Sequence, residues 1–482
     1  MSANNNPLIK RVFFLAVFVN VICLVSYSYA AENRSLWQKR QKNIETIANT
    51  QQAPTKKTFQ KLIDPLKIKI PEEFGTIISS HRGSNGKLIV HIQDAHANFE
   101  GQMNLANILE SLIKEYELNL ILVEGGSSDA DFAYLRKRAS PEERRKEAEK
   151  LLKNGVITGE EYLNIATDYP MSFQGIEERD VYDRHVSALW EVDKFKDVAI
   201  EYVDSLASVS DVLKPHIYNK ALLELDKARK DYEDKKIDLV SYYRYMNNEA
   251  GKNNVNLEKF PNFTSLIKIN EIEGKIDIEK IKDGKASAEE VELYKDYVRL
   301  SKGMDINKLF KEEPLLEDLL KESLAVNSGQ KTLIRVSKAL AIMKDLLHIK
   351  IVPEEYEYFI RNRSDFDPEF WASILKEKSD YYNLSLNVPS NYYVIKDNLA
   401  KVEEFYKIAK ERDEIFLKKS EWRIEKDEAK LAALIAGGFH TPRLTELLAD
   451  KGYSYIVVSP KVTEETDETF YRSTLRRQWL SE

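Results

Sequence analysis

The sequence has little glycine and almost no cysteine: of 482 residues, 17 are glycine and 1 is cysteine. A typical globular composition has about 7% glycine, or roughly 34 residues at this length. The shortage excludes collagen-like repeats, glycine-rich linkers and turn-dense all-β folds for most of the chain. A basic surplus is also missing, since the net charge is −7. This acidic balance argues against nucleic-acid binding, because phosphates need basic partners.

Apolar residues, by contrast, are plentiful. They make up 43% of the chain, which is enough for a buried core. We therefore do not expect the chain to be disordered throughout. The length corresponds to roughly two to four domain-sized units.

The N-terminus has the features of a secretory signal. Lys10 and Arg11 form a small positive region, and an apolar run follows over residues 12–25. Small residues then precede a cleavage position after Ala30. The alternative is a retained membrane anchor, but the run is shorter than the roughly 20 residues that a transmembrane helix needs. We therefore expect residues 1–30 to be removed.

Removal of this signal has three consequences for the mature protein. It is exported, either to a periplasm or to the outside of the cell. It has no stable membrane span, because no later stretch is apolar enough. It has no disulfides, because the one cysteine, Cys23, leaves with the signal.

Strand and helix patterns alternate after a polar, helix-prone arm over residues 31–76. Residues 75–82 and 87–93 flank a short glycine-containing turn, which predicts a β-hairpin. A helical pattern and then a compact apolar run over residues 119–123 follow the second strand. Strand, helix and strand at this spacing form a βαβ unit, which implies parallel strands.

The middle of the chain has a different composition. Only five of the glycines fall between Ile176 and Ala436, in a region dense in Lys, Glu, Leu, Ile and Tyr. We expect a long all-helical insertion over residues 181–395. It splits an α/β core, made of residues 77–180 and 396–482, in which helices flank a central and mostly parallel sheet.

Polar residues follow four of the apolar runs in the predicted core, at the point where each run ends. They are Asp94 and His96, then Glu124, then Glu177 and Glu178, and finally His440. In open α/β sheets, ligands bind outside the carboxyl ends of parallel strands. If the runs are parallel neighbours, two histidines and several carboxylates meet at one edge of the sheet. Such a set suits either a divalent metal or acid–base chemistry.

The same residues carry a resemblance to the TIKI/TraB superfamily, which includes erythromycin-esterase-like and ChaN-like proteins. Residues 437–440 (Gly-Gly-Phe-His) resemble the second histidine motif of that superfamily, and residues 123–125 resemble its glutamate motif. Residues 175–177 resemble a second acidic motif. Residues 411–413, which contain Arg412, resemble its Arg-Asp element.

The first histidine motif departs from the superfamily pattern. Residues 93–96 (Gln-Asp-Ala-His) have glutamine where glycine is expected, so Asp94 is a candidate for an added site residue. The resemblance covers the two core segments and leaves the helical region out.

The resemblance implies a hydrolase of peptides or esters, with two versions of the site. In one version His96, Glu124 and His440, with Asp94 as an additional ligand, hold Mn, Co or Zn, which activates a bound water. In the other version a histidine is the general base, Glu124 or Glu177 orients it, and Arg412 neutralises an oxyanion or pairs with a carboxylate.

Two alternatives remain open at this point. One is a ChaN-like exported protein that binds haem or another ligand. The other is an interaction scaffold in which the helical insertion binds a protein partner.

Overall fold

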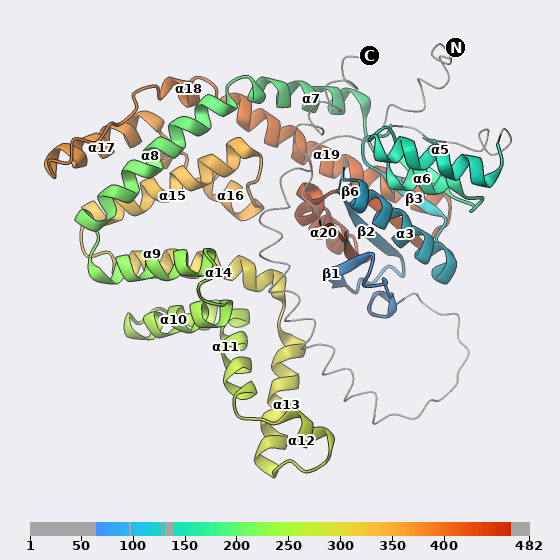
Figure 1. The fold of residues 1–482 in the computed structure, drawn as a ribbon, viewed down its shortest axis with the longest axis horizontal. Helices are drawn as coiled ribbons and strands as arrows, with labels where there is room; N and C mark the ends of the chain where they lie inside the picture. The colour runs from blue at the N-terminus through green and yellow to red at the C-terminus, as the bar shows by residue number, and fades with distance from the viewer. Residues whose placement is uncertain (1–63, 96–97, 128, 131–138, 464–482) are drawn as a thin grey trace. The chain divides into compact units, whose positions relative to one another are not determined.

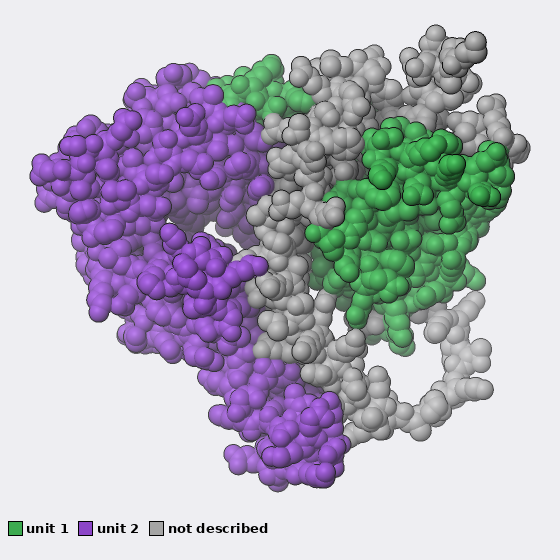
Figure 2. Space-filling view, viewed as in Figure 1, with its two compact units in different colours: residues 1–25, 58–195, 398–482 green, residues 26–57, 196–397 purple. Residues whose placement is uncertain are grey.

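The computed structural model describes residues 64–95, 98–127, 129–130 and 139–463. The predicted signal and most of the predicted N-terminal arm therefore lie outside the described residues. The chain divides into two compact units (Figure 2). The described part of the first unit ends at Phe195 and resumes at Asn398, and the second unit contains residues 196–397.

The first unit is built on a seven-stranded sheet with the order β1-β7-β2-β6-β3-β5-β4. The strands from β7 to β5 run parallel to one another, and only the edge strands β1 and β4 are antiparallel to their neighbours. The predicted α/β class with a mostly parallel sheet is confirmed. The strands are β1 (Gly75–His81), β2 (Leu88–Asp94), β3 (Leu120–Val123), β4 (Asp129–Ala130), β5 (Ser172–Gly175), β6 (Leu431–Gly437) and β7 (Ser454–Pro460).

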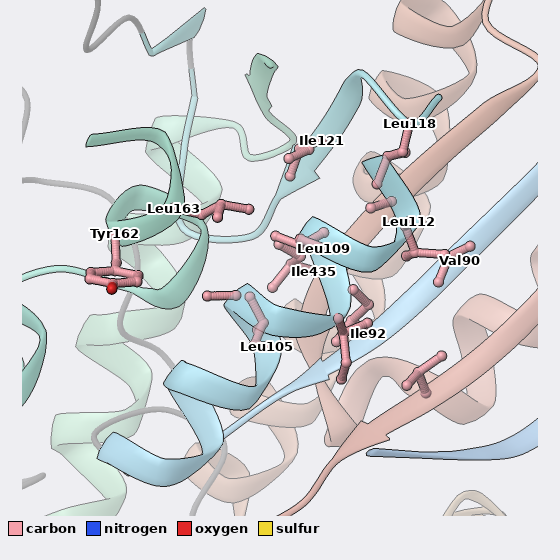
Figure 3. Packing of buried hydrophobic residues seen from close by; sticks show 14 of the residues in the cluster. Val90, Ile92, Leu105, Leu109, Leu112, Leu118, Ile121, Tyr162, Leu163 and Ile435 are labelled. Atoms are coloured by element: carbon pink, nitrogen blue, oxygen red, sulfur yellow. The ribbon is translucent and has the colours of Figure 1, made fainter. Parts of the chain in front are cut away.

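Helices cover both faces of this sheet because the strand side chains alternate between two apolar layers. On one face, Leu105, Leu109 and Leu112 pack against Val90, Ile92, Ile121 and Ile435 (Figure 3). The helices of this face are α3 (Phe99–Tyr116), α5 (Pro141–Lys153) and α6 (Gly159–Ala166). On the other face, α19 (Leu399–Lys426) and α20 (Thr441–Asp450) pack against a second apolar layer. The same unit includes α7 (Arg179–Asp193), which packs along α19 (Figure 1), and the short helices η1 (Pro65–Lys67) and η4 (Gly438–His440).

Local sequence signals account for several helix ends. Ser140 and Glu143 form a capping box at the start of α5, with Pro141 as its first residue. Gly452, beyond the end of α20, has a φ of +74°, a conformation that favours glycine. Thr441 is the first residue of α20, and His440 occupies the cap position without a side-chain capping bond.

The predicted β-hairpin is wrong. β1 and β2 do not pair with each other, because β7 lies between them. The loop between β1 and β2 donates its Ser84 and Asn85 backbone N–H groups to the Gly452 carbonyl, just before β7 begins. The Gly83 N–H group binds the Ser454 hydroxyl at the first residue of β7. The loop therefore holds the incoming strand instead of closing a tight turn.

The second unit is entirely helical in the described residues, as expected for the insertion. It begins at Lys196, whereas the predicted insertion began at residue 181, because α7 belongs to the α/β unit. Its helices are α8 (Lys196–Ile217), α9 (Lys220–Glu233), α10 (Leu239–Lys252), η2 (Leu257–Lys259), α11 (Pro261–Glu273), α12 (Ile278–Lys282), α13 (Ala288–Gly303), α14 (Ile306–Leu324), α15 (Ser328–His348), α16 (Pro353–Arg361), η3 (Arg363–Asp365), α17 (Pro368–Tyr381) and α18 (Tyr393–Lys396). Among the described residues, no helix combines the length and apolarity that crossing a membrane requires.

Candidate functional site

The carboxyl ends of three adjacent parallel strands bring two glutamates together. β3 lies between β5 and β6, so Glu124 after β3 and Glu177 after β5 lie at the same edge of the sheet. Glu124 Oε2 accepts a hydrogen bond from the Gly437 N–H group at 2.7 Å, and Glu177 Oε1 accepts one from Gly125 at 3.3 Å. Backbone groups of the strand ends thus fix both carboxylates in place.

Arg412 of α19 binds both carboxylates with one guanidinium group. Nη2 donates to Glu124 Oε1 at 2.8 Å and also to Glu177 Oε1, and Nε donates to Glu177 Oε2 at 3.2 Å. The remaining nitrogen, Nη1, lies 2.8 Å from His185 Nδ1. Because arginine stays protonated and only donates, this nitrogen of His185 must be the acceptor. Arg412 is fully buried, so all of its polar groups are used within the protein.

Only one of the two ring nitrogens of His440 makes a hydrogen bond among the described residues. Its Nδ1 lies 2.5 Å from Oδ1 of Asp413, the residue that follows Arg412 on α19. Its Nε2 lies 3.5 Å from Glu124 Oε1, an ion-pair distance, and has no hydrogen-bond partner among the described residues. The ring also contacts Phe416 and Phe439, with centroids 5.0 and 5.3 Å away. His440 is fully buried, so Nε2 is a buried polar atom left without a hydrogen bond.

Burial and charge pairing act on this site in opposite directions. Burial lowers the pKa of His440, but Asp413 and Glu124 outweigh it and raise that pKa to about 9. Burial raises the pKa of Asp413 and of Glu177, and neighbouring cations offset part of each rise. Burial and Arg412 together hold the pKa of His185 well below its ordinary value. At neutral pH, His440 is therefore the protonated imidazole of this site and His185 the neutral one.

The structure brings together four of the residues that the sequence singled out. Glu124, Glu177, Arg412 and His440 form one connected cluster. The expectation that Asp94 joins them is wrong. Side chains alternate along β2, so Asp94 shares a face with Val90 and Ile92, where it accepts a hydrogen bond from Gln102 of α3. His96 lies outside the described residues.

Two residues of the cluster were not among the predicted site residues. Asp413 had a usable signal, because it belongs to the Arg-Asp element next to Arg412. His185 had none, since it lies within a helix and far from any strand end. It enters the site because α7 packs along α19, where its ring also stacks on Phe405 at 4.4 Å.

The described residues do not fit a divalent metal. Both oxygens of Glu124 and both of Glu177 accept from N–H groups, and Nδ1 of His440 is bound to Asp413. This leaves His440 Nε2 without a hydrogen bond among the described residues, and the Arg412 guanidinium that binds both glutamates would repel a cation. No group of three or more acidic, His or Cys side chains suited to a metal occurs in the described part of the chain.

Glycines at the strand ends allow the backbone geometry that positions the two carboxylates. Gly125 has a φ of +83°, which favours glycine and turns its N–H group toward Glu177. A Cβ atom at Gly175 would lie 2.1 Å from the Gly126 backbone, so only glycine allows these segments to approach so closely.

Comparison of the chain with family models, with curated proteins and with solved structures gives no match.

Proposed function

We propose that this protein is a metal-independent hydrolase of esters or peptides, in which His440 is the general base and Asp413 orients it. The observation that carries the proposal is the asymmetry of His440. One ring nitrogen is fixed on a carboxylate at 2.5 Å, and the other is buried and has no hydrogen-bond partner among the described residues. A nitrogen in this state can accept a proton from water, while the carboxylate stabilises the imidazolium that forms.

In the proposed reaction, His440 takes one proton from water and later gives it to the leaving group. The oxygen of a water molecule attacks the acyl carbon, and one proton of that water moves to His440 Nε2. As the tetrahedral intermediate collapses, the bond to the leaving alcohol or amine breaks and Nε2 returns the proton to that group. Because the pKa of His440 is raised to about 9, the neutral base form becomes abundant only at alkaline pH.

Arg412 has a positioning role in this scheme. Its nitrogens are engaged by Glu124, Glu177 and His185, so it holds the carboxylates and does not face a substrate oxyanion. Because His440 is fully buried, a substrate reaches Nε2 only after surrounding parts of the protein move.

Two further proposals concern the family to which the protein belongs and its location in the cell. The metal-free site is the version that the erythromycin-esterase-like branch of the TIKI/TraB resemblance implies. We also propose export with cleavage after Ala30. Fractionation of cells that express the full chain, with mass measurement of the mature N-terminus, tests this second proposal. An uncleaved chain in the cytoplasm would contradict it.

Hydrolysis of p-nitrophenyl esters and of a quenched-fluorescence peptide library, each with EDTA present, tests the activity. We expect His440→Ala to lower kcat by roughly 10² to 10⁴-fold, the usual contribution of a general base. His216→Ala is the matched control, because His216 is exposed and lies in the helical unit. Equal rates in the two variants would show that turnover does not use His440.

A further inference from the structure

Two side chains of β2 reach across to the residue that follows His440. Nε2 of His91 lies 2.8 Å from Thr441 Oγ1, and Nε2 of Gln93 donates to the same oxygen at 3.0 Å. The other ring nitrogen of His91 lies 3.1 Å from the Leu434 carbonyl oxygen on β6. His91 is fully buried, and Gln93 and Thr441 are 7% exposed.

With His91 neutral, the hydrogen-bond directions in this group have one consistent assignment. Gln93 Nε2 is a donor, so Thr441 Oγ1 accepts from it, and the single hydroxyl proton of Thr441 goes to His91 Nε2. His91 Nδ1 then carries the ring proton and donates it to the Leu434 carbonyl. This arrangement requires a neutral imidazole, in agreement with burial, which lowers the pKa of His91 to about 4.

Thr441 directs its hydroxyl to these two bonds and not to the start of its own helix. It is the first residue of α20, and no side chain caps that helix end. Its hydroxyl instead ties the junction between η4 and α20 to β2. Since His440 is the last residue of η4, the same bonds restrain the backbone that sets the orientation of its ring.

We propose that His91 and Gln93 are positioning residues, which hold His440 through Thr441 so that Nδ1 stays on Asp413 and Nε2 stays in the site. The role assigned to His440 rests on the proposed function, whereas the restraint on its ring does not. It assigns a role to Gln93, the glutamine that stands where the expected first histidine motif has glycine.

The test removes the Thr441 hydroxyl and reads the state of His440 directly. Thr441→Val deletes both bonds at nearly constant volume, and Thr441→Ser keeps the hydroxyl. Thr445→Val is the matched control, since its hydroxyl bonds only to the carbonyls of Thr441 and Pro442 in the same helix. NMR titration of ¹³C-labelled histidine resolves seven side chains, and His440→Ala assigns the signal of His440.

We expect Thr441→Val to move the His440 titration from about pH 9 toward neutral pH, because the ring loosens from Asp413. Thr441→Ser and Thr445→Val should titrate like the wild type. In the pH–rate profile, the ascending limb, which reports deprotonation of His440, should move in the same direction in Thr441→Val. Its kcat should fall by up to about a hundredfold, the size of effect that misplacement of a catalytic group produces.

Identical His440 titrations in Thr441→Val and Thr445→Val would overturn the inference. If Thr441→Val does not fold, Gln93→Leu, which removes one of the two bonds, provides the same comparison with a smaller shift. The titration does not depend on turnover. A wild type without hydrolytic activity would therefore contradict the proposed function while the inference on positioning is still decided by NMR.

Discussion

Each unit of the molecule contains an arginine that faces two glutamates, and the two clusters are completed differently. In the helical unit, Arg229 Nη1 donates to Glu317 Oε2 at 2.6 Å and lies 3.5 Å from Glu313 Oε1. The hydroxyls of Tyr242 and Tyr243 bind these two carboxylates, and Lys321 binds Glu317. In the α/β unit, imidazoles complete the cluster around Arg412.

The difference separates a structural ion network from a candidate site. The network of Arg229 has a donor for each of its carboxylates, and the Arg229 side chain is 36% exposed. The cluster of Arg412 is fully buried and leaves Nε2 of His440 without a hydrogen bond. A buried polar atom of this kind costs free energy, which indicates a purpose other than stability.

Removal of each arginine should give the largest contrast. Arg412→Met leaves two buried carboxylates facing each other, so we expect it to lower the free energy of unfolding of the α/β unit by about 3–5 kcal/mol. Arg229→Met should lower that of the helical unit by less, about 1–3 kcal/mol, because Arg229 is partly exposed, Lys321 stays bound to Glu317 and Tyr243 stays bound to Glu313. Hydrogen exchange measured by mass spectrometry reports each unit separately. Equal losses would remove the distinction between the two clusters.

The two clusters should also lose stability at opposite ends of the pH scale. The pKa of His440 is raised from an ordinary 6.5 to about 9, so its contribution is complete below pH 6.5 and disappears as the pH rises through 9. Burial raises the pKa of Glu317, but Lys321 and Arg229 outweigh it and lower that pKa from 4.5 to about 2. Its contribution is complete above pH 4.5 and disappears as the pH falls through 2.

We expect on the order of 3 kcal/mol to be lost at each end. Hydrogen exchange in the α/β unit at pH 7 and pH 10, and in the helical unit at pH 5 and pH 3, checks the direction. His440→Gln should abolish the alkaline response, and Glu317→Gln the acidic one. A helical unit that weakens first on the alkaline side would show that other groups dominate.

A smaller effect is expected when the carboxylate partner of His440 loses its charge. Asp413→Asn should lower the pKa of His440 by about one to two pH units, because a charge-assisted hydrogen bond is replaced by a neutral one. The ascending limb of the pH–rate profile should move by the same amount. Asp427→Asn is the control, since Asp427 pairs with Arg423 near the end of the same helix. An unshifted limb in Asp413→Asn would exclude Asp413 as the orienting group.

The smallest expected effect is that of a chelator. Because the oxygens of Glu124 and Glu177 are bound to N–H donors, dialysis against EDTA should leave both turnover and thermal stability unchanged. Restoration of lost activity by Mn, Co or Zn would contradict the metal-free site and support the metal version predicted from the sequence.

The sequence predicts the parts of this site that follow from strand ends. Glu124, Glu177 and His440 each lie within three residues of the carboxyl end of a strand, and parallel strands place these ends along one edge. Asp94 also lies at the end of a strand, but its side chain is on the other face of the sheet. Its spacing of two residues from Ile92 and four from Val90 places it on their face. His185 could not be predicted, because its place depends on how α7 packs along α19.

Pairing between distant strands is the other property that local patterns missed. A short glycine-containing loop between two strands usually indicates a hairpin, and residues 83–86 fit that rule. The competing partner, β7, begins about 370 residues later in the chain, as the bond between Gly83 and Ser454 shows. No local signal distinguishes a closed hairpin from one that another strand enters.

The strand order has a consequence for how the chain folds. β2 is buried along its whole length, and its two neighbours, β6 and β7, both follow the helical unit in the chain. While the protein is being synthesised, β2 therefore has both edges unpaired until residues 431–460 exist. The helical unit is contiguous over residues 196–397 and can form earlier. The sheet is then the late and slow step, and its unpaired edges are where misassembly of the new chain would begin.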